Sequence, residues 1–337
     1  MITLGIECTA HTLGVGMVRG GKVLSNAADV YKPKGEGILP RKAADHHAEV
    51  FGAVLQQSLA DAKIRMEDVG LIAFSQGPGI GSPLAVGISG ARYLAHRFGK
   101  KIIGVNHCFA HIAISERLTG LNDPLVLYLS GGNSQILVRR DAGHGTRDSD
   151  WHVLGETLDI GIGNLFDSFG RAIGLEYAHG SELEKLAKNG KYVELPYSVK
   201  GMNLVFSGLL TASEKLAKQG AKKEDLAYSM METSFAMTCE ATERALFLTK
   251  KKKLICCGGV AQNARLKAML KTMCDEDGVR FGVAPDEFNR DNGAMIAYAG
   301  EVLFRKRGAM PLERCVAVTN YRIERMNEVH GGRAYGR

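Results

Sequence analysis

Two histidines in the segment NHCFAH, His107 and His111, have the spacing that most directly suggests chemistry. Four residues apart on a helix, both imidazoles lie on one face and can bind the same metal ion. Cys108 stands where the HExxH proteases carry the glutamate that acts as general base. The spacing therefore predicts a metal site and argues against a zinc protease, although such pairs also occur in helices that bind no metal.

A further metal ligand must come from another part of the chain. Asp291, in the segment RDNGAMIA, is a candidate because a carboxylate is a hard oxygen donor that can complete a histidine-rich site. The alternative is that Asp291 caps the helix that follows it, since Asp is favoured at that position. His46 and His47 form a second histidine pair. Because His47 lies near the apolar face of a predicted helix, we interpret it as a core or rim residue.

Three glycine clusters follow apolar runs, as turns at the ends of buried strands do, and ligands bind at such ends in α/β folds. They are Gly77 to Gly81, Gly131-Gly132 and Gly258-Gly259. Their backbone N–H groups can bind phosphate. Neither a Walker A loop nor a GxGxxG motif is present, which excludes the P-loop and Rossmann phosphate sites. Each cluster alone is most simply a tight turn, but the three together favour a nucleotide site.

The elements that must position these residues occur twice along the chain. The strand-like runs ITLGIEC, LGVGMVR and KVLSNAADV open the sequence, and LVLYLS, QILVRR and WHVLGET repeat the pattern after Pro124. Each half continues into helices that alternate with short strands, which indicates an α/β fold with mostly parallel sheets. The apolar spacing predicts helices over residues 41–62, 82–97, 106–118, 223–249, 260–277 and 292–306.

The repeat predicts two lobes with a nucleotide and a metal in the cleft between them. The N-terminal lobe comprises residues 1–122 and the C-terminal lobe residues 123–325. The helix at 292–306 is expected to pack back toward the region between the lobes. Residues 326–337 have no pattern and are expected to form a frayed tail.

Composition limits the class of protein and its compartment. The 337 residues include 41 glycines and seven cysteines, and the formal net charge is +7. An odd number of cysteines without a CxxC pair argues against a disulfide framework or a structural zinc site and favours the reducing cytosol. No run is apolar enough to span a bilayer. The positive charge suits a nucleic acid, although solvated basic faces would give the same balance.

Taken in order, these motifs resemble one enzyme family along nearly the whole chain, from about Thr3 to Arg322. The matching segments are GIECTAHTLGVG, PRKAADHHAEV, SQGPGIGSPLAVG, NHCFAHI, YLSGGNSQILV, LGETLDIGIGNLFDSFGR, PYSVKGMNLVFSGLLTA, CGGVAQNARL and RDNGAMIA. The chain resembles the universal tRNA threonylcarbamoyladenosine synthases. It is most similar to the archaeal and eukaryotic branch, which contains the catalytic subunit of the KEOPS complex.

The resemblance implies an actin/hexokinase-like (ASKHA) fold of two duplicated lobes. It also implies that the threonylcarbamoyl group passes from threonylcarbamoyl-AMP to the exocyclic amine of the adenosine 3′ of the anticodon. The tRNAs concerned read codons that begin with A. A small kinase-like ATPase and other KEOPS-type subunits are the implied partners. Because the chain has no HRD or DFG motif, that kinase is expected to be a separate chain.

The resemblance also assigns residues to sites. The implied ligands of one iron or zinc ion are His107, His111, Tyr128 and Asp291. The implied contacts to the adenylate are Tyr128, Leu129, Ser130, Gly131, Gly132, Asp167, Gly180, Glu184 and Asn263. Tyr128 could instead be an ordinary strand aromatic, Asn263 a helix cap, and Asp167 and Glu184 solvated helix positions.

Three points stay open in the sequence. The family pattern Pro-Gly-Gly-Pro is replaced here by the segment Ala178-His179-Gly180-Ser181, which changes the surroundings of Gly180. No general base is assigned, although Glu7 at the end of the first strand is a candidate. A small-molecule kinase or carbamoyltransferase with the same fold is the alternative function.

Overall fold

The computed structural model describes residues 1–33, 37–139 and 151–326. The chain divides into two compact units, which we describe separately. Unit 1 contains Met1–Lys32, Gly37–Leu118 and the segment from Arg290 onward, and unit 2 is mainly Thr119–Asn289. Within the described residues, no helix is long and apolar enough to cross a membrane.

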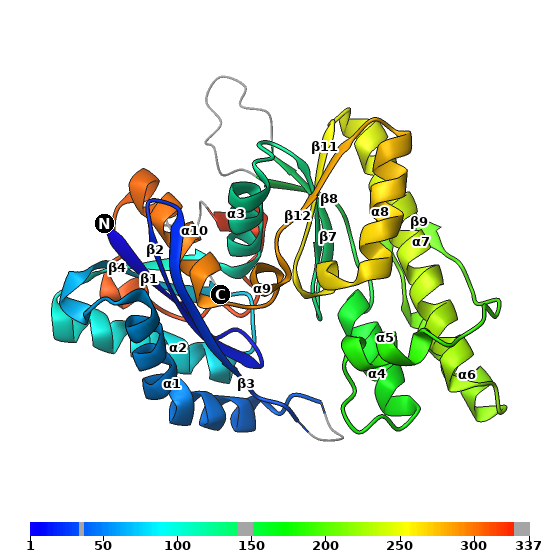
Figure 1. Ribbon diagram of the computed structural model, residues 1–337, viewed down its shortest axis with the longest axis horizontal. Coiled ribbons are helices and arrows are strands. Elements are labelled where there is room, and N and C mark those ends of the chain that lie inside the picture. The colour runs from blue at the N-terminus through cyan, green and yellow to red at the C-terminus, as the bar shows by residue number, and fades with distance from the viewer. Residues whose placement is uncertain (34–36, 140–150, 327–337) are drawn as a thin grey trace. The chain divides into compact units, whose positions relative to one another are not determined.

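The sheet of unit 1 has the strand order β3-β2-β1-β4-β5, and its strands β1 to β4 are labelled in Figure 1. Strands β1, β2 and β3 form an antiparallel meander, while β4 and β5 run parallel to β1. Their bounds are β1 Ile2–Glu7, β2 Thr12–Arg19, β3 Lys22–Val30, β4 Val69–Gly77 and β5 Lys101–Asn106. Parallel β1, β4 and β5 therefore end at the same edge of the sheet, and β5 leads directly into the predicted histidine helix.

The sheet of unit 2 repeats this arrangement with the order β12-β11-β6-β7-β8. Strands β6, β7 and β8 form the meander, and β11 and β12 run parallel to β6. Their bounds are β6 Leu125–Leu129, β7 Ser134–Arg139, β8 Trp151–Glu156, β11 Lys253–Cys257 and β12 Arg280–Val283. The predicted internal duplication is confirmed, because each sheet joins a three-strand meander to two parallel strands in the same order.

Helices cover both faces of the unit 1 sheet. Leu4 and Ile6 of β1 belong to an apolar cluster with Val54 of α1 and Leu84 of α2. Gly5 points to the opposite face, where a Cβ atom would lie 2.2 Å from the backbone nitrogen of Ala297. The helices of this unit are α1 Pro40–Ala62, α2 Gly81–Phe98, α3 His107–Thr119 and α10 Gly293–Arg307, with 3₁₀ turns η1 Met66–Asp68, η3 Leu312–Arg314 and η4 Ile323–Arg325.

The predicted boundary of the C-terminal lobe needs one correction, and glycines in β1 and β2 give the reason. The sequence predicts a C-terminal lobe that extends to residue 325, but the segment from Arg290 belongs to unit 1. Helix α10 lies with its backbone against the sheet because Gly5 and Gly16 leave room: a Cβ at Gly16 would lie 2.3 Å from the nitrogen of Ala294. The tail predicted at 326–337 lies, apart from Met326, outside the described residues.

Helices α4 to α9 belong to unit 2. Phe166 and Phe169 of α4 and Phe235 of α7 lie in its apolar core, and the rings of Phe166 and Phe235 meet edge to face. The elements are α4 Ile162–Ala172, α5 Gly180–Ala187, α6 Ser207–Lys218, α7 Lys223–Thr249, α8 Ala264–Glu276 and α9 Asp286–Asn289, with short strands β9 Val199–Lys200 and β10 Asn203–Leu204 and the turn η2 Gly259–Gln262. The predicted helix at 260–277 is thus a 3₁₀ turn followed by α8.

Candidate metal centre and nucleotide loops

Helix α3 places both histidines of the NHCFAH segment in the interior of unit 1. Strand β5 ends at Asn106, whose side-chain oxygen accepts a hydrogen bond of 3.0 Å from the backbone N–H of Phe109 and so supports the start of α3. The rings of His107 and His111 lie 4.8 Å apart, nearly perpendicular to each other. They are 6% and 1% exposed, so the helical spacing predicted from the sequence brings the two imidazoles together in a buried site.

Asp291 completes the cluster from the other end of the chain. Its Oδ1 atom lies 3.4 Å from His107 Nε2 and 3.3 Å from His111 Nε2. The alternative role of Asp291 as a helix cap is wrong, because Asn292 holds that position. The Asn292 side chain accepts a 2.9 Å hydrogen bond from the backbone N–H of Met295. The carboxylate of Asp291 is therefore directed to the histidines.

The geometry of the three side chains fits a small divalent cation. Two imidazole nitrogens and one carboxylate oxygen lie within 4.8 Å of one another. Ligand atoms about 2.0–2.1 Å from a tetrahedral zinc ion are roughly 3.4 Å apart, close to both distances from Asp291. This donor set suits zinc and iron alike.

The carboxylates of Glu7 and Asp291 place negative charge beside the two imidazoles. Burial opposes protonation of His107, but the carboxylates of Glu7 and Asp291 outweigh it and raise the pKa of His107 well above its ordinary value. Burial lowers the pKa of His111. The two histidines lower the pKa of Asp291 well below its ordinary value, although burial acts in the opposite direction. Asp291 is thus a carboxylate that faces two nitrogen donors.

Tyr128 belongs to unit 2, where it lies in β6 and is 2% exposed. It pairs with Gln135 of β7 and Cys257 of β11 in the sheet register. Its alternative interpretation as a strand aromatic is consistent with this placement, and its role as a metal ligand stays a prediction.

The turn after β6 packs tightly on the start of α4. The Ser130 side chain accepts a hydrogen bond of 3.2 Å from the Asn133 backbone N–H and so closes the turn. The Gly131 carbonyl accepts a hydrogen bond of 2.8 Å from the Asn164 backbone N–H. A Cβ atom at Gly163 would lie 2.6 Å from Gly131 Cα. Gly131 and Gly132 are exposed, so this turn presents backbone to solvent at a helix start, as anion sites do.

Of the residues assigned to the adenosine, Asp167 and Gly180 are in contact. The Asp167 side chain of α4 and the backbone N–H of Gly180 form a hydrogen bond, and burial raises the pKa of Asp167 to about 6. Glu184 lies one turn further along α5 and is half-buried. In the segment that departs from the family pattern, His179 Nδ1 accepts a 3.3 Å hydrogen bond from the Ser181 N–H. The imidazole caps α5, so the helix start survives without the family's prolines.

Asn263 is the N-cap of α8, which confirms the alternative prediction that it caps a helix. Its side-chain oxygen accepts a 3.0 Å hydrogen bond from the Leu266 N–H. Nearby, Gly258 has a φ of 92°, and a Cβ there would lie 2.4 Å from the Leu129 carbonyl oxygen. The glycine turn after β11 therefore packs on the end of β6, next to Ser130.

Comparison with known proteins decides the family. A family model described as tRNA N6-adenosine threonylcarbamoyltransferase matches residues 21–298. The protein of that description from Thermococcus sibiricus is 49% identical over 97% of this chain and 99% of its own length. Its counterpart from Thermococcus kodakarensis is 48% identical over 98% of this chain and 99% of its own length. The chain belongs to the tRNA N6-adenosine threonylcarbamoyltransferase family.

Other similarities concern length and fold. A probable bifunctional tRNA threonylcarbamoyladenosine biosynthesis protein from Methanothermobacter thermautotrophicus is 45% identical over 97% of this chain, but only over 60% of its own length. Among solved structures, HypF from T. kodakarensis has a TM-score of 0.60 at 14% identity, over 91% of this chain and 48% of HypF. That likeness and the duplicated sheets support the predicted actin/hexokinase-like α/β fold.

The sequence does not reveal two contacts in this family member. Asn164 lies against the glycine turn: its side-chain Oδ1 would be 3.5 Å from a Cβ at Gly131. The only sequence signal was its place just after the glycines of the IGIGN segment. Glu7, the candidate general base, is fully buried, and its carboxylate lies 3.0 Å from His107 Nδ1. The His46 and His47 prediction is confirmed, since His47 is buried and its Nε2 lies 3.0 Å from the Ala10 carbonyl oxygen.

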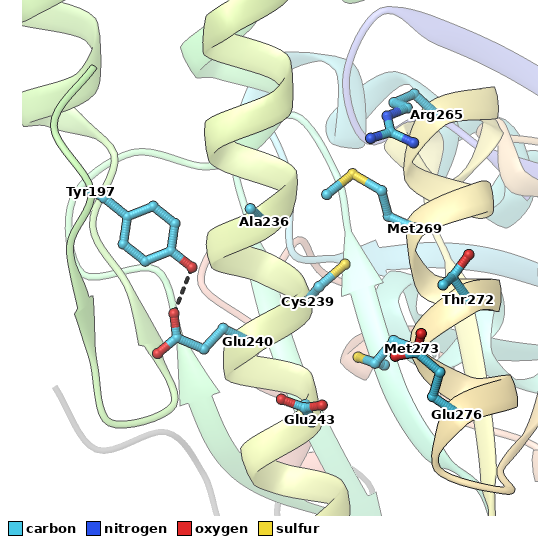
Figure 2. A pocket seen from close by; sticks show the side chains of 10 residues that line it. All are labelled: Tyr197, Ala236, Cys239, Glu240, Glu243, Arg265, Met269, Thr272, Met273 and Glu276. Atoms are coloured by element: carbon cyan, nitrogen blue, oxygen red, sulfur yellow. Dashed lines mark hydrogen bonds between the residues drawn. The ribbon is translucent and has the colours of Figure 1, made fainter. Parts of the chain in front are cut away.

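A separate pocket in unit 2 of the transferase lies between α7 and α8 (Figure 2). Its volume is about 490 Å³, and Glu240, Glu243 and Glu276 line it together with Met269. The hydroxyl of Tyr197 donates a 2.5 Å hydrogen bond to Glu240 across one end. None of the residues assigned to the metal or the adenylate lines this pocket, so it is not part of the candidate site.

Proposed function

We propose that this chain transfers the threonylcarbamoyl group from threonylcarbamoyl-AMP to the exocyclic amine of the adenosine 3′ of the anticodon. The tRNAs concerned are those that read codons beginning with A. The observation that carries the proposal is a match at almost half identity over nearly the full length of two threonylcarbamoyltransferases. The +7 charge of the chain suits a tRNA substrate.

We further propose that His107, His111 and Asp291, with Tyr128 as a fourth ligand, hold one iron or zinc ion. The buried cluster in unit 1 supports the first three ligands. When bound, the ion would neutralise negative charge on the adenylate phosphate and polarise the carbonyl group. The low pKa of Asp291 keeps a charged ligand ready for the ion.

The adenylate is proposed to bind unit 2 through the residues that the family resemblance assigns. The turn of Ser130, Gly131 and Gly132, with Leu129 before it, would donate backbone N–H groups to the phosphate. Asp167, Gly180, Glu184 and Asn263 would hold the adenosine portion. The exposed backbone of the turn and the hydrogen bond between Asp167 and Gly180 support this assignment.

In the proposed reaction the adenosine nitrogen attacks the carbonyl carbon of the threonylcarbamoyl group. A carbon–nitrogen bond forms, the carbon–oxygen bond to the phosphate breaks, AMP leaves, and the nitrogen loses one proton. An exocyclic amine of adenosine is a weak nucleophile, so positioning of the two substrates must supply much of the acceleration. The backbone donors of the 130–132 turn would stabilise charge on the departing phosphate.

Partner subunits and the compartment are part of the proposal. We propose that the chain works in the cytosol with KEOPS-type subunits, including a small kinase-like ATPase. Relatives named as bifunctional support a second component, because this chain matches only 59% to 61% of their length. The odd number of cysteines without a CxxC pair supports the reducing compartment.

The test is a reconstituted transfer assay. The metal-loaded protein and its partner subunits are incubated with unmodified tRNA, threonine, bicarbonate, ATP and a threonylcarbamoyl-adenylate synthase. Mass spectrometry of the digested tRNA should show threonylcarbamoyladenosine with the wild type and none with His107→Ala. Absence of product with folded wild type and active partners would refute the transferase and favour a small-molecule kinase or carbamoyltransferase of the same fold.

A further inference from the structure

Glu7 is a buried carboxylate at the end of β1 whose two oxygens both have partners. It is 0% exposed. Its Oε1 atom accepts a 2.7 Å hydrogen bond from the Thr9 N–H and another from the Thr9 hydroxyl. Its Oε2 atom lies 3.0 Å from His107 Nδ1. Burial of a carboxylate is unfavourable unless such partners are present, so the position of Glu7 is tied to Thr9 and His107.

The contact between Glu7 and His107 keeps a proton on the Nδ1 atom of His107. A carboxylate oxygen accepts hydrogen bonds, so the Nδ1 atom of His107 donates. In a neutral imidazole with a proton on Nδ1, Nε2 keeps its lone pair. That Nε2 atom is the one that lies 3.4 Å from Asp291 Oδ1. Glu7 thus holds the ring with its metal-binding nitrogen directed into the cluster.

We propose that Glu7 is a positioning residue that orients His107 for metal binding, and that it does not act as a general base. A carboxylate that accepts from the second nitrogen of a metal-bound imidazole fixes the tautomer and makes the ring a stronger ligand. Glu7 has no surface through which it could reach the tRNA amine. This inference rests on the metal site of the proposed function and adds a residue to it.

Two further hydrogen bonds hold the turn between β1 and β2, which carries Thr9, in place. The Thr9 carbonyl accepts a 2.7 Å hydrogen bond from the Ile80 N–H. The Ala10 carbonyl oxygen lies 3.0 Å from His47 Nε2, which donates to it. These contacts fix the backbone that carries the Thr9 donors. Because Thr9 in turn holds Oε1 of Glu7, the orientation of His107 is supported by a chain of hydrogen bonds from β1, the turn after β4 and α1.

The experiment measures binding of Co²⁺ to the purified full chain, with absorption in the visible range as the signal. Glu7→Gln should raise the dissociation constant by about 10- to 100-fold, the usual effect of losing a carboxylate behind a metal-bound histidine. It should also change the Co²⁺ spectrum, because the orientation of one ligand changes. Glu301→Gln is the matched control: Glu301 is 3% exposed in the same unit and accepts hydrogen bonds from the backbone of Gly20 and Gly21.

An unchanged dissociation constant and spectrum in folded Glu7→Gln would overturn the inference, as would an equal loss with Glu301→Gln. If Glu7→Gln does not fold, Thr9→Val decides, since it removes one donor to Glu7: a raised dissociation constant supports the inference and an unchanged one overturns it. His107→Ala reports on the metal site itself. Full Co²⁺ affinity in His107→Ala would refute the proposed metal site, separately from the role of Glu7.

Discussion

The two sheets have the same strand order, yet the turns that follow their first strands differ in chemistry. Strand β1 ends at Glu7 and Thr9 follows it; both are buried, and the Glu7 carboxylate is hydrogen-bonded to Thr9 and to His107. After β6 the equivalent turn carries Gly131 and Gly132, which are exposed and hold no side chain. A buried carboxylate supports ligands of a cation, whereas exposed backbone N–H groups suit an anion. The two units thus share a strand order, and their turn residues fit the proposed division into a metal site in unit 1 and a phosphate site in unit 2.

The comparison predicts its largest effect at the metal ligands. His107→Ala should reduce transfer by more than about 100-fold, because loss of a residue behind a ligand already costs 10- to 100-fold. Metal content, measured by elemental analysis, should fall in parallel. The thermal midpoint in the presence of a chelator should stay near that of the wild type. Undiminished transfer by the folded variant would contradict a separate metal role for unit 1.

In unit 2, Gly163→Ala tests the glycine turn. Its Cβ would lie 2.6 Å from Gly131 Cα, so the turn must shift. We expect transfer to fall by up to about 10²-fold and the free energy of unfolding by about 1–3 kcal/mol, with Co²⁺ affinity unchanged. Gly208→Ala is the matched control, since Gly208 is the second residue of α6 and has open space around its Cβ position. Equal transfer by both variants would show that the turn tolerates displacement.

Asp167 sharpens the contrast with Glu7, because its burial is only partly compensated. Burial raises its pKa from 3.8 to about 6, so the stability that the protonated carboxyl contributes is fully present below pH 3.8 and is lost as the pH rises through 6. Asp167→Asn is neutral throughout and keeps an oxygen for the Gly180 N–H. It should raise the free energy of unfolding by on the order of 2 kcal/mol at about pH 8 and leave it unchanged at about pH 4.

Urea denaturation at both pH values measures this difference. If Asp167 holds the adenosine portion as proposed, the same variant should bind adenylate more weakly, because a charged hydrogen-bond acceptor is lost. A stability difference that does not depend on pH would contradict the raised pKa of Asp167.

Asn263 gives the smallest expected effect and separates its two roles. Asn263→Ala removes the cap of α8 and should lower the free energy of unfolding by about 1 kcal/mol. Asn263→Asp keeps the capping oxygen that accepts from Leu266, so its stability should match the wild type. Adenylate affinity, measured by calorimetry, should fall in both variants if the amide contacts the nucleotide. Normal affinity in Asn263→Asp would leave Asn263 with the capping role alone.

The sequence by itself determined the repeated α/β pattern, the helix at 106–118 that pairs two histidines, and the glycine turns. The strands and helices follow from the local spacing of apolar residues. The turns follow from glycine, which adopts backbone conformations that other residues avoid. The order of the motifs along the chain also indicates the transferase family.

Only the tertiary structure decided which polar residues meet. Asp291 and Asn292 are equally good helix caps on local grounds, and the packing of α10 against Gly5 and Gly16 assigns the cap to Asn292 and the carboxylate to the histidines. The same packing moved the segment from Arg290 into unit 1. Glu7 and His107 are 100 residues apart in the sequence. They meet because the parallel strands β1 and β5 end at the same edge of the sheet, and no local sequence pattern predicts such a contact.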